Sequence, residues 1–232
     1  TVLRGGFVRD AEGLASRFGE LSSQLDLVQS ETDQAVQSAV SQINTLVGAL
    51  AGVNKQLTKI KTEAAQPPDL LDQRDKLLKD LAGYAHVNTR FSENGTVKVS
   101  IGASVDRDVL VDGNNGFMIG ANFKSASAEK VSLVLDPYGT PAVLSNISGG
   151  QLSGLLSFRE QVLGGTRGAL NTLATTMVKE INQVHRMGID AYGQAGGDLF
   201  GIDPTAIDAA GAIKVMFTDP LRVSAAAQFR VI

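Results

Sequence analysis

The sequence has 232 residues, a formal net charge of −3, 43% hydrophobic residues and no cysteine or tryptophan. A chain of this length can bury a sizeable core, which excludes the class of small proteins that need disulfides or metals to fold. The lack of cysteine also excludes thiolate catalysis and Cys-ligated zinc or iron–sulfur centres. The net charge of −3 argues against a large basic surface for nucleic acid. The longest nearly apolar stretch, Val47 to Val53, is much shorter than the roughly 20 residues that span a bilayer.

A long amphipathic helix is predicted from Leu14 to Ile60, because apolar residues there alternate in steps of four and three. The repeat positions are Leu14, Phe18, Leu21, Leu25, Val28, Thr32, Ala35, Ala39, Ile43, Leu46, Leu50, Val53, Leu57 and Ile60. The step from Ala39 to Ile43 is four where three was due, which indicates a stutter in the heptad repeat.

A second, shorter helix is predicted after Pro67-Pro68, because the paired prolines end the first helix. Asp69 is placed to cap this helix or to complement its dipole, and Gly83 is suited to end it. After His86 the hydrophobic period changes from helical to alternating, which predicts strands.

A small β subdomain is predicted over residues 86–147. Asn94-Gly95 lies between two alternating runs and is the dipeptide most typical of a hairpin turn. The expected strands are Val87–Phe91, Val97–Ile101, Val109–Val111, Phe117–Ile119, Val131–Leu135 and one near Val143-Leu144.

A return helix is predicted after Ser148-Gly149-Gly150, where helical periodicity resumes. Its repeat positions are Leu156, Leu163, Leu170, Met177 and Val184, with Leu173 and Ile181 between them. From Gly188 a glycine-rich loop leads to weakly β-like segments at Ile213–Phe217 and Leu221–Val223.

The predicted fold class is α+β, a long antiparallel helical rod or bundle with an inserted small β subdomain and the start of a second β-rich domain. We expect outgoing helices over residues 1–85, the β insertion over 86–150 and the return helix over 151–188. Residues 189–232 are expected to form a glycine-rich joint and the beginning of an outer β-rich domain. Because the sequence does not begin with methionine, we expect it to be the central part of a longer subunit.

Enzymatic chemistry receives little support from the residues present. The sequence has no G-x-S-x-G nucleophile motif, and only His86 and His185 can supply an imidazole. His86 is expected at a helix-to-strand junction and His185 near a helix C-terminus, and both are interpreted as structural. We therefore expect no catalytic residues.

Two acidic segments have spacings that resemble cation sites. Asp69, Asp72 and Asp75 lie near one face of the predicted helix around Arg74, yet acids in a first turn also complement the helix dipole. The loop at residues 190–198 lacks the alternating acids and terminal glutamate of an EF-hand, and its glycines are explained by the turns they allow. We expect neither a metal nor a cofactor.

Four ordered motifs carry a resemblance to a known family. They are Ile43-Asn44-Thr45-Leu46 with Val53-Asn54-Lys55-Gln56-Leu57; Leu70-Leu71-Asp72-Gln73-Arg74-Asp75-Lys76-Leu77; Ser148-Gly149-Gly150-Gln151-Leu152-Ser153-Gly154-Leu155-Leu156-Ser157-Phe158-Arg159; and the spaced set Asn182, His185, Gly188, Asp190, Gly193, Gly196, Asp198 and Phe200. In this order they resemble the bacterial flagellar hook-associated proteins of the hook–filament junction, the FlgK family.

The resemblance implies structural work outside the cell in the bacterial flagellum, in filament assembly and motility. It implies a homo-oligomeric ring with the hook protein and a second junction protein as axial neighbours, no catalytic residue, no cofactor, and no binding to nucleic acid or membrane. It also implies export by the flagellar type III apparatus with a dedicated chaperone. The chain by itself is expected to be monomeric, and the alternative is another exported coiled-coil protein, such as a secretion-needle translocator or an adhesin.

Within this resemblance the motif residues receive structural roles. We expect Asp72, Arg74 and Asp75 to form a charged corner that ties the short helix to the rod. The return helix is expected to bury a seam of Leu156, Leu163, Leu170 and Met177. The glycines expected to form joints between helices and β units are Gly149, Gly150, Gly188, Gly193, Gly196 and Gly197.

Overall fold

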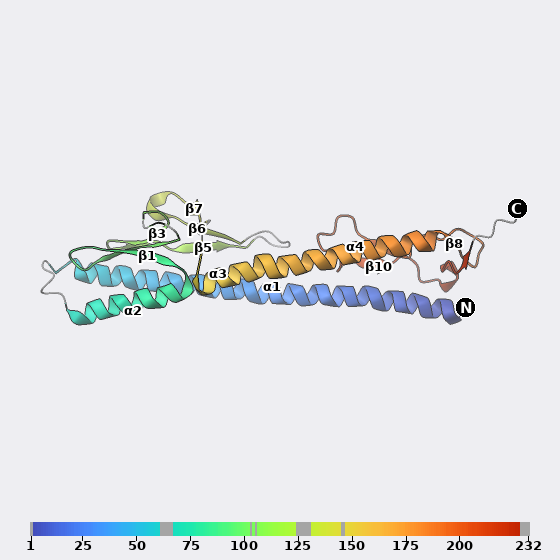
Figure 1. Cartoon of the computed structure of the whole chain (residues 1–232), viewed down its shortest axis with the longest axis horizontal. Helices are drawn as coiled ribbons and strands as arrows, with labels where there is room; N and C mark the ends of the chain where they lie inside the picture. The colour runs from blue at the N-terminus through green and yellow to red at the C-terminus, as the bar shows by residue number, and fades with distance from the viewer. Residues whose placement is uncertain are drawn as a thin grey trace. The chain divides into compact units, whose positions relative to one another are not determined.

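The computed structural model describes residues 2–60, 67–102, 104, 106–123, 131–144 and 147–227. They form two compact units (Figure 1). The terminal unit comprises residues 1–29 and 162–232, and the central unit comprises residues 30–161. Helices are combined with small antiparallel sheets in both, which confirms the α+β class. The four-part division into domains stays a prediction.

The first helix, α1, runs from Val2 to Leu57 and contributes to both units. It begins earlier than the heptad pattern predicted and stays helical through the stutter after Ala39. The second helix, α2 (Pro68–Tyr84), has Pro67 at its N-cap and Asp69 in its first turn, with no side-chain cap. Asp69 therefore acts through the helix dipole rather than as a cap.

The central unit holds two antiparallel sheets. One sheet has the order β1 (Val87–Phe91), β2 (Val97–Ile101), β3 (Val109–Asp112) and β4 (Asn115–Gly116), and the other has the order β5 (Ile119–Asn122), β6 (Ser132–Leu135) and β7 (Ala142–Val143). The strand predicted to start at Phe117 begins at Ile119 instead.

The Asn-Gly prediction for the β1–β2 hairpin is confirmed. Phe91 pairs with Val97, and the turn between them contains Asn94 and Gly95, the latter with φ of 75°. The Oδ1 atom of Asn94 accepts hydrogen bonds from the amide and hydroxyl of Thr96, at 3.2 and 2.7 Å. The turn residues thus satisfy their own polar groups, as expected for this dipeptide.

Both sheets share one hydrophobic core with helices instead of closing on a core of their own. The core side chains come from α1, α2, both sheets and α3, and include Val36, Ile43, Val47, Leu50, Leu81, Val99, Leu110, Leu133, Leu135 and Leu152. The sheets therefore pack along α1, through residues such as Val36, Ile43 and Leu50. Small sheets with one apolar face need another layer to cover it, and α1 supplies that layer.

The return helix is not one continuous α-helix. It consists of α3 (Gly150–Ser157), a π-helical segment η3 (Phe158–Leu163) and α4 (Gly164–Arg186). A π segment holds more residues per turn than an α-helix, so it rotates the face that the following residues present. Beyond it, the heptad positions Leu170 and Met177 pack partly against the terminal core.

In the terminal unit, α1 and α4 run antiparallel, since Asp26 pairs with Arg167 whereas Ala11 and Phe18 share a core with Ala174 and Val178 (Figure 1). The buried positions of α4 are Ala174, Val178, Asn182 and His185. The predicted seam residue Leu163 is buried, and Leu170 and Met177 are half-buried against the terminal core. Leu173 and Val184 are 59% and 65% exposed, so these two members of the predicted repeat lie outside the buried face.

Two short sheets complete the terminal unit. β9 (Phe200–Ile202) pairs with β10 (Ile213–Val215), and β8 (Gly188–Ile189) pairs with β11 (Ala226–Ala227). The strand predicted at Leu221–Val223 is wrong: Pro220–Arg222 forms a 3₁₀ turn, because proline favours its first position and Asp219 caps it by accepting from the Leu221 amide. No helix among the residues placed by the structure is long and apolar enough to cross a membrane.

Candidate functional site

Arg74 attaches α2 to the β1–β2 hairpin within the central unit. Its Nη1 donates to the carbonyl of Gly95 at 2.7 Å, its Nη2 lies 2.7 Å from the carboxylate of Asp75, and its guanidinium stacks over the Phe91 ring at 4.6 Å. Asp72 and Gln73 are exposed and Leu71 is half-buried. The predicted corner therefore reaches the hairpin instead of α1.

Replacing Arg74 by alanine is expected to lower the free energy of unfolding by about 1–3 kcal/mol. The change removes a charge-assisted hydrogen bond to Gly95 and a cation–π contact. Lys79→Ala, an exposed cation on the same helix, is the matched control. Urea unfolding followed by circular dichroism measures both, and equal midpoints for the two variants would remove Arg74 from this role.

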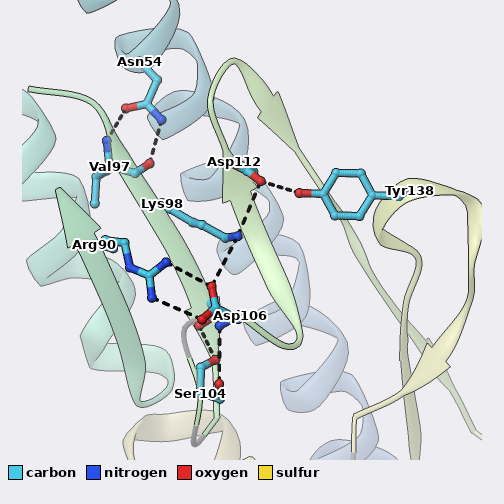
Figure 2. Close-up of polar contacts among 9 residues, drawn as sticks. Asn54, Arg90, Val97, Lys98, Ser104, Asp106, Asp112 and Tyr138 are labelled. Atoms are coloured by element: carbon cyan, nitrogen blue, oxygen red, sulfur yellow. Dashed lines mark hydrogen bonds and ion pairs between the residues drawn. The ribbon is translucent and has the colours of Figure 1, made fainter. Parts of the chain in front are cut away.

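Two asparagines of α1 act as amide clamps on the sheets. Asn54, fully buried, donates from Nδ2 to the carbonyls of Val97 (2.8 Å) and Gly113 (2.7 Å), while its Oδ1 accepts from the Val97 amide at 3.0 Å (Figure 2). Asn44 makes the same two-way contact with Ile119, at 2.9 and 2.8 Å. A carboxamide presents a donor and an acceptor as a peptide group does, so each clamp pairs with backbone groups in or next to the strands.

An exposed polar network lies on the sheet that contains β2 and β3 (Figure 2). Lys98 lies 3.7 Å from Asp106 and 3.6 Å from Asp112, and Arg90 makes a two-pronged contact with Asp106 at 3.1 Å. The hydroxyl of Tyr138 donates to Asp112, and this hydrogen bond raises the pKa of Tyr138. Because Arg90 and Asp106 are exposed and Lys98 and Asp112 are only half-buried, their ion pairs contribute little to stability.

The Ser148-Gly149-Gly150 motif forms a tight joint between α2 and α3. The carbonyl of Ser148 accepts from the His86 amide at 2.8 Å, which places His86 at the helix-to-strand junction that was predicted. Gly149 and Gly150 have φ of 64° and 66°. An added Cβ on Gly150 would lie 2.5 Å from the backbone nitrogen of Ala85, so only glycine fits there.

Arg159, at the end of the same motif, is a buried charged residue. It is 5% exposed, and its Nε lies 2.5 Å from the carboxylate of Asp33 on α1. Leu155 and Leu156 pack against the central core, whereas Phe158 is 38% exposed. The motif thus packs α3 against the central core and joins η3 to α1 through the Arg159–Asp33 ion pair.

The fourth motif forms a joint in the terminal unit. Asn182 is a third amide clamp: its Oδ1 accepts from the amides of Leu199 and Phe200, and its Nδ2 donates to the Phe200 carbonyl at 2.8 Å. His185 is buried, with Nε2 accepting from the Ser224 amide at 3.0 Å and Nδ1 2.6 Å from the Gly197 carbonyl. This pattern requires the neutral imidazole with its proton on Nδ1.

The glycine-rich loop is closed by its own side chains. Asp190 Oδ1 accepts from the amides of Tyr192 and Gln194 at 2.8 and 2.9 Å, and Gly193 has φ of 77°. Gly188 lies in β8, and its carbonyl accepts from the Gly196 amide at 3.0 Å. Among the residues that the structure covers, no group of three or more His, Cys, Asp or Glu side chains is arranged to hold a metal ion.

The structure brings the motif residues together in two places. The α2, α3 and η3 motif residues, from Leu71 to Arg159, belong to the central unit, and those from Asn182 to Gly193 belong to the terminal unit. The amide-clamp function of Asn44 and Asn54 was missed from sequence, although a signal was present: each is a polar residue next to an apolar repeat position of a long helix.

Comparison with known proteins places these motifs in a wider group. A family model described as the flagellar hook-associated protein FlgK helical domain matches residues 1–200. The chain is 32% identical over 206 residues to flagellar hook-associated protein 1 of Salmonella typhimurium, covering 86% of this chain and 36% of that protein. It is 30% identical over 211 residues to the Escherichia coli K12 protein of the same name, covering 88% and 38%.

A solved structure is also similar. It is titled as the flagellar hook junction protein FlgK from Burkholderia pseudomallei, and it matches with a TM-score of 0.75 and 27% identity over 86% of this chain and 36% of that chain. The present chain therefore spans less than two fifths of the length of these relatives. The shared flagellar description favours the hook–filament reading over a needle translocator or an adhesin.

Proposed function

The chain belongs to the FlgK family of flagellar hook-associated proteins, whose helical domain it matches over residues 1–200, and from this membership we propose that it works as part of the junction between hook and filament. In this role it is a structural subunit of the bacterial flagellum, exported from the cell and needed for filament assembly and motility. The single observation that carries the proposal is the family match across most of the chain, supported by the similar hook junction structure.

The internal contacts are those expected of a rigid structural subunit. Three asparagine clamps, at Asn44, Asn54 and Asn182, hold long helices to strands through paired hydrogen bonds. Arg159 and Asp33 add a buried ion pair between η3 and α1. Directional buried contacts of this kind specify one arrangement of helix and sheet more strictly than apolar packing alone. A structural subunit of a junction needs such fixed internal geometry.

The partners follow from the same proposal. We assign to the complete subunit a homo-oligomeric ring, the hook protein and a second junction protein as axial neighbours, and a flagellar export chaperone. The chain described here is assigned no catalytic function and no cofactor, and the motif residues are assigned to holding its elements together.

A chimera tests the proposed function. Grafting residues 1–200 in place of the matching segment of the Salmonella typhimurium relative is expected to preserve swimming and filaments, because the segment supplies an equivalent scaffold. Motility plates and electron microscopy of filaments measure the outcome. The control is the Salmonella typhimurium protein with its own segment reinserted at the same two junctions. A chimera that is exported and folded but leaves hooks without filaments would contradict the proposal.

A further inference from the structure

His185 of α4 connects two segments of the terminal unit through its two ring nitrogens. The residue is 6% exposed, its Nδ1 lies 2.6 Å from the Gly197 carbonyl, and its Nε2 accepts from the Ser224 amide at 3.0 Å. The ring also packs against the Phe217 ring, with 5.6 Å between the ring centres. The imidazole is therefore held in one orientation, as a donor toward Gly197 and as an acceptor toward Ser224.

The contact with Ser224 lies where residues 224–227 attach to the rest of the unit. These residues lead into β11, which pairs with β8 over two residues. The chain just before them has its own attachment, since the Ala191 amide donates to the Leu221 carbonyl at 2.9 Å. A pair of such short strands is marginal by itself, so the hydrogen bond from Ser224 to His185 helps to hold residues 224–227 in place.

Protonation of His185 would act on its two hydrogen bonds in opposite directions. A proton on Nε2 replaces the acceptor by a donor, which then faces the donor of the Ser224 amide, so this bond is lost. Nδ1 already donates to the Gly197 carbonyl, and a positive charge on the ring strengthens that bond. Ser224 packs tightly against Gly196, because a Cβ added to Gly196 would overlap the Ser224 side chain, which leaves little room for a bridging water.

The charged side chains around His185 differ from it in the pH range over which they titrate. The charged residues that line the same surface hollows as His185, Gly197 or Phe217 are Asp10, Glu180, Asp190, Asp198, Asp219 and Arg222. Arg186, next to His185, pairs with Asp198 at 2.5 Å between Nη2 and Oδ1. Carboxylic acids and guanidinium groups ordinarily change charge outside the range from about pH 5 to 8, whereas an imidazole changes charge within it. A transition of this unit within that range is therefore expected to originate at His185.

We propose that His185 is an acid-sensitive latch, which holds residues 224–227 on the terminal unit at neutral pH and releases them when Nε2 is protonated. The released form binds one more proton than the latched form, so a falling pH shifts the equilibrium toward release. The contacts at Gly197 and Asn182 stay closed, because neither loses a hydrogen bond on protonation. Since the sequence continues beyond Ala227, the latch decides whether the following residues leave the unit from a fixed point.

Amide hydrogen exchange of the 232-residue chain, followed by nuclear magnetic resonance, tests the latch. After correction for the intrinsic pH dependence of exchange, the protection factor of the Ser224 amide is expected to fall about tenfold from pH 8.0 to pH 5.5. This is the change that results when the released imidazole binds one proton near its ordinary value of about pH 6.5. The Leu199 and Phe200 amides, which Asn182 holds on the same helix, are the internal control and should change less than twofold.

Two histidine variants assign the transition, since the sequence contains two histidines. His185→Gln keeps a donor and an acceptor but binds no proton in this range, so protection of the Ser224 amide is expected to become independent of pH. His86→Gln, at an exposed residue of the central unit, is the matched control and should keep the tenfold change. Circular dichroism checks that both variants are folded.

Four results would each overturn the proposal. Protection of the Ser224 amide that does not change with pH in the original chain removes the latch, and equal losses at Leu199 and Phe200 show that the unit loosens as a whole. A change that persists in folded His185→Gln, or that disappears in His86→Gln, assigns the titration to another group. Nitrogen-15 shifts of the His185 ring decide independently of any variant: at pH 8.0 they should show the Nδ1–H tautomer, and the Nε2–H tautomer would leave no acceptor for Ser224.

Discussion

Gly150→Ala is expected to destabilise the central unit by roughly 2–5 kcal/mol. A Cβ at this position would lie 2.5 Å from both the Tyr84 carbonyl oxygen and the Ala85 backbone nitrogen. These are main-chain atoms at the end of α2, so they cannot move aside as a flexible side chain would. The φ of 66° adds a further penalty for any residue with a Cβ. Urea unfolding followed by far-ultraviolet circular dichroism measures the loss.

Gly154→Ala provides a closely matched control in the same helix. An added Cβ at Gly154 meets nothing within 4 Å, so alanine there should leave stability unchanged or increase it by about 1 kcal/mol through helix propensity. Hydrogen exchange at the His86 amide, which donates to Ser148, localises the Gly150 effect to the joint. If Gly150→Ala and Gly154→Ala unfold at the same urea concentration, the close approach of the two helices is not required for stability.

Asn54→Leu is expected to cost roughly 3–5 kcal/mol. The side chain is fully buried and satisfies the amide and carbonyl of Val97 and the carbonyl of Gly113. Leucine has a similar size but no polar atoms, so three backbone groups would remain without partners, at about 1–3 kcal/mol for each unsatisfied group before partial relaxation. Urea unfolding gives the total loss, and faster hydrogen exchange at the Val97 amide identifies its origin.

Gln56→Leu, two residues away and exposed, controls for the increased hydrophobicity of α1. It should unfold within about 0.5 kcal/mol of the original chain, as surface substitutions usually do. Asn54→Asp separates the two halves of the clamp, because it keeps the acceptor for the Val97 amide and removes both donors. A clamp function is refuted if Asn54→Leu is no less stable than Gln56→Leu.

Periodicity identified most of the elements because it depends on local chemistry. The alternation around Asn94-Gly95 predicted β1 and β2, and the steps of three and four predicted α1. The predicted strand at Leu221–Val223 failed because Pro220 and the Asp219 cap produce a turn that apolar residues alone do not reveal. In α4 the apolar repeat could be recognised from the sequence, but the direction in which it faces could not. The π-helical segment η3 changes the phase of the helix before α4 reaches the terminal core.

The candidate site, like the fold, could be predicted from the sequence only in part. The motifs containing Arg74, Gly150 and Asn182 were recognisable as residue patterns, but their contacts were not. Arg74 was expected to meet the rod and instead binds the hairpin carbonyl of Gly95, which lies 21 positions later in the chain. Asn54 and Val97, 43 positions apart, become partners only when β2 packs on α1.

The sequence by itself determined the α+β class, the long helices, the strands of the central unit and the family, because helical and strand periods and short ordered motifs are local properties of the chain. Tertiary structure decided which faces are buried and where the asparagine clamps close. The physical reason is that burial and hydrogen-bond satisfaction depend on which segments meet. At Gly150 that dependence is most direct: its requirement for glycine arises from the backbone of Tyr84 and Ala85, 65 residues or more before it.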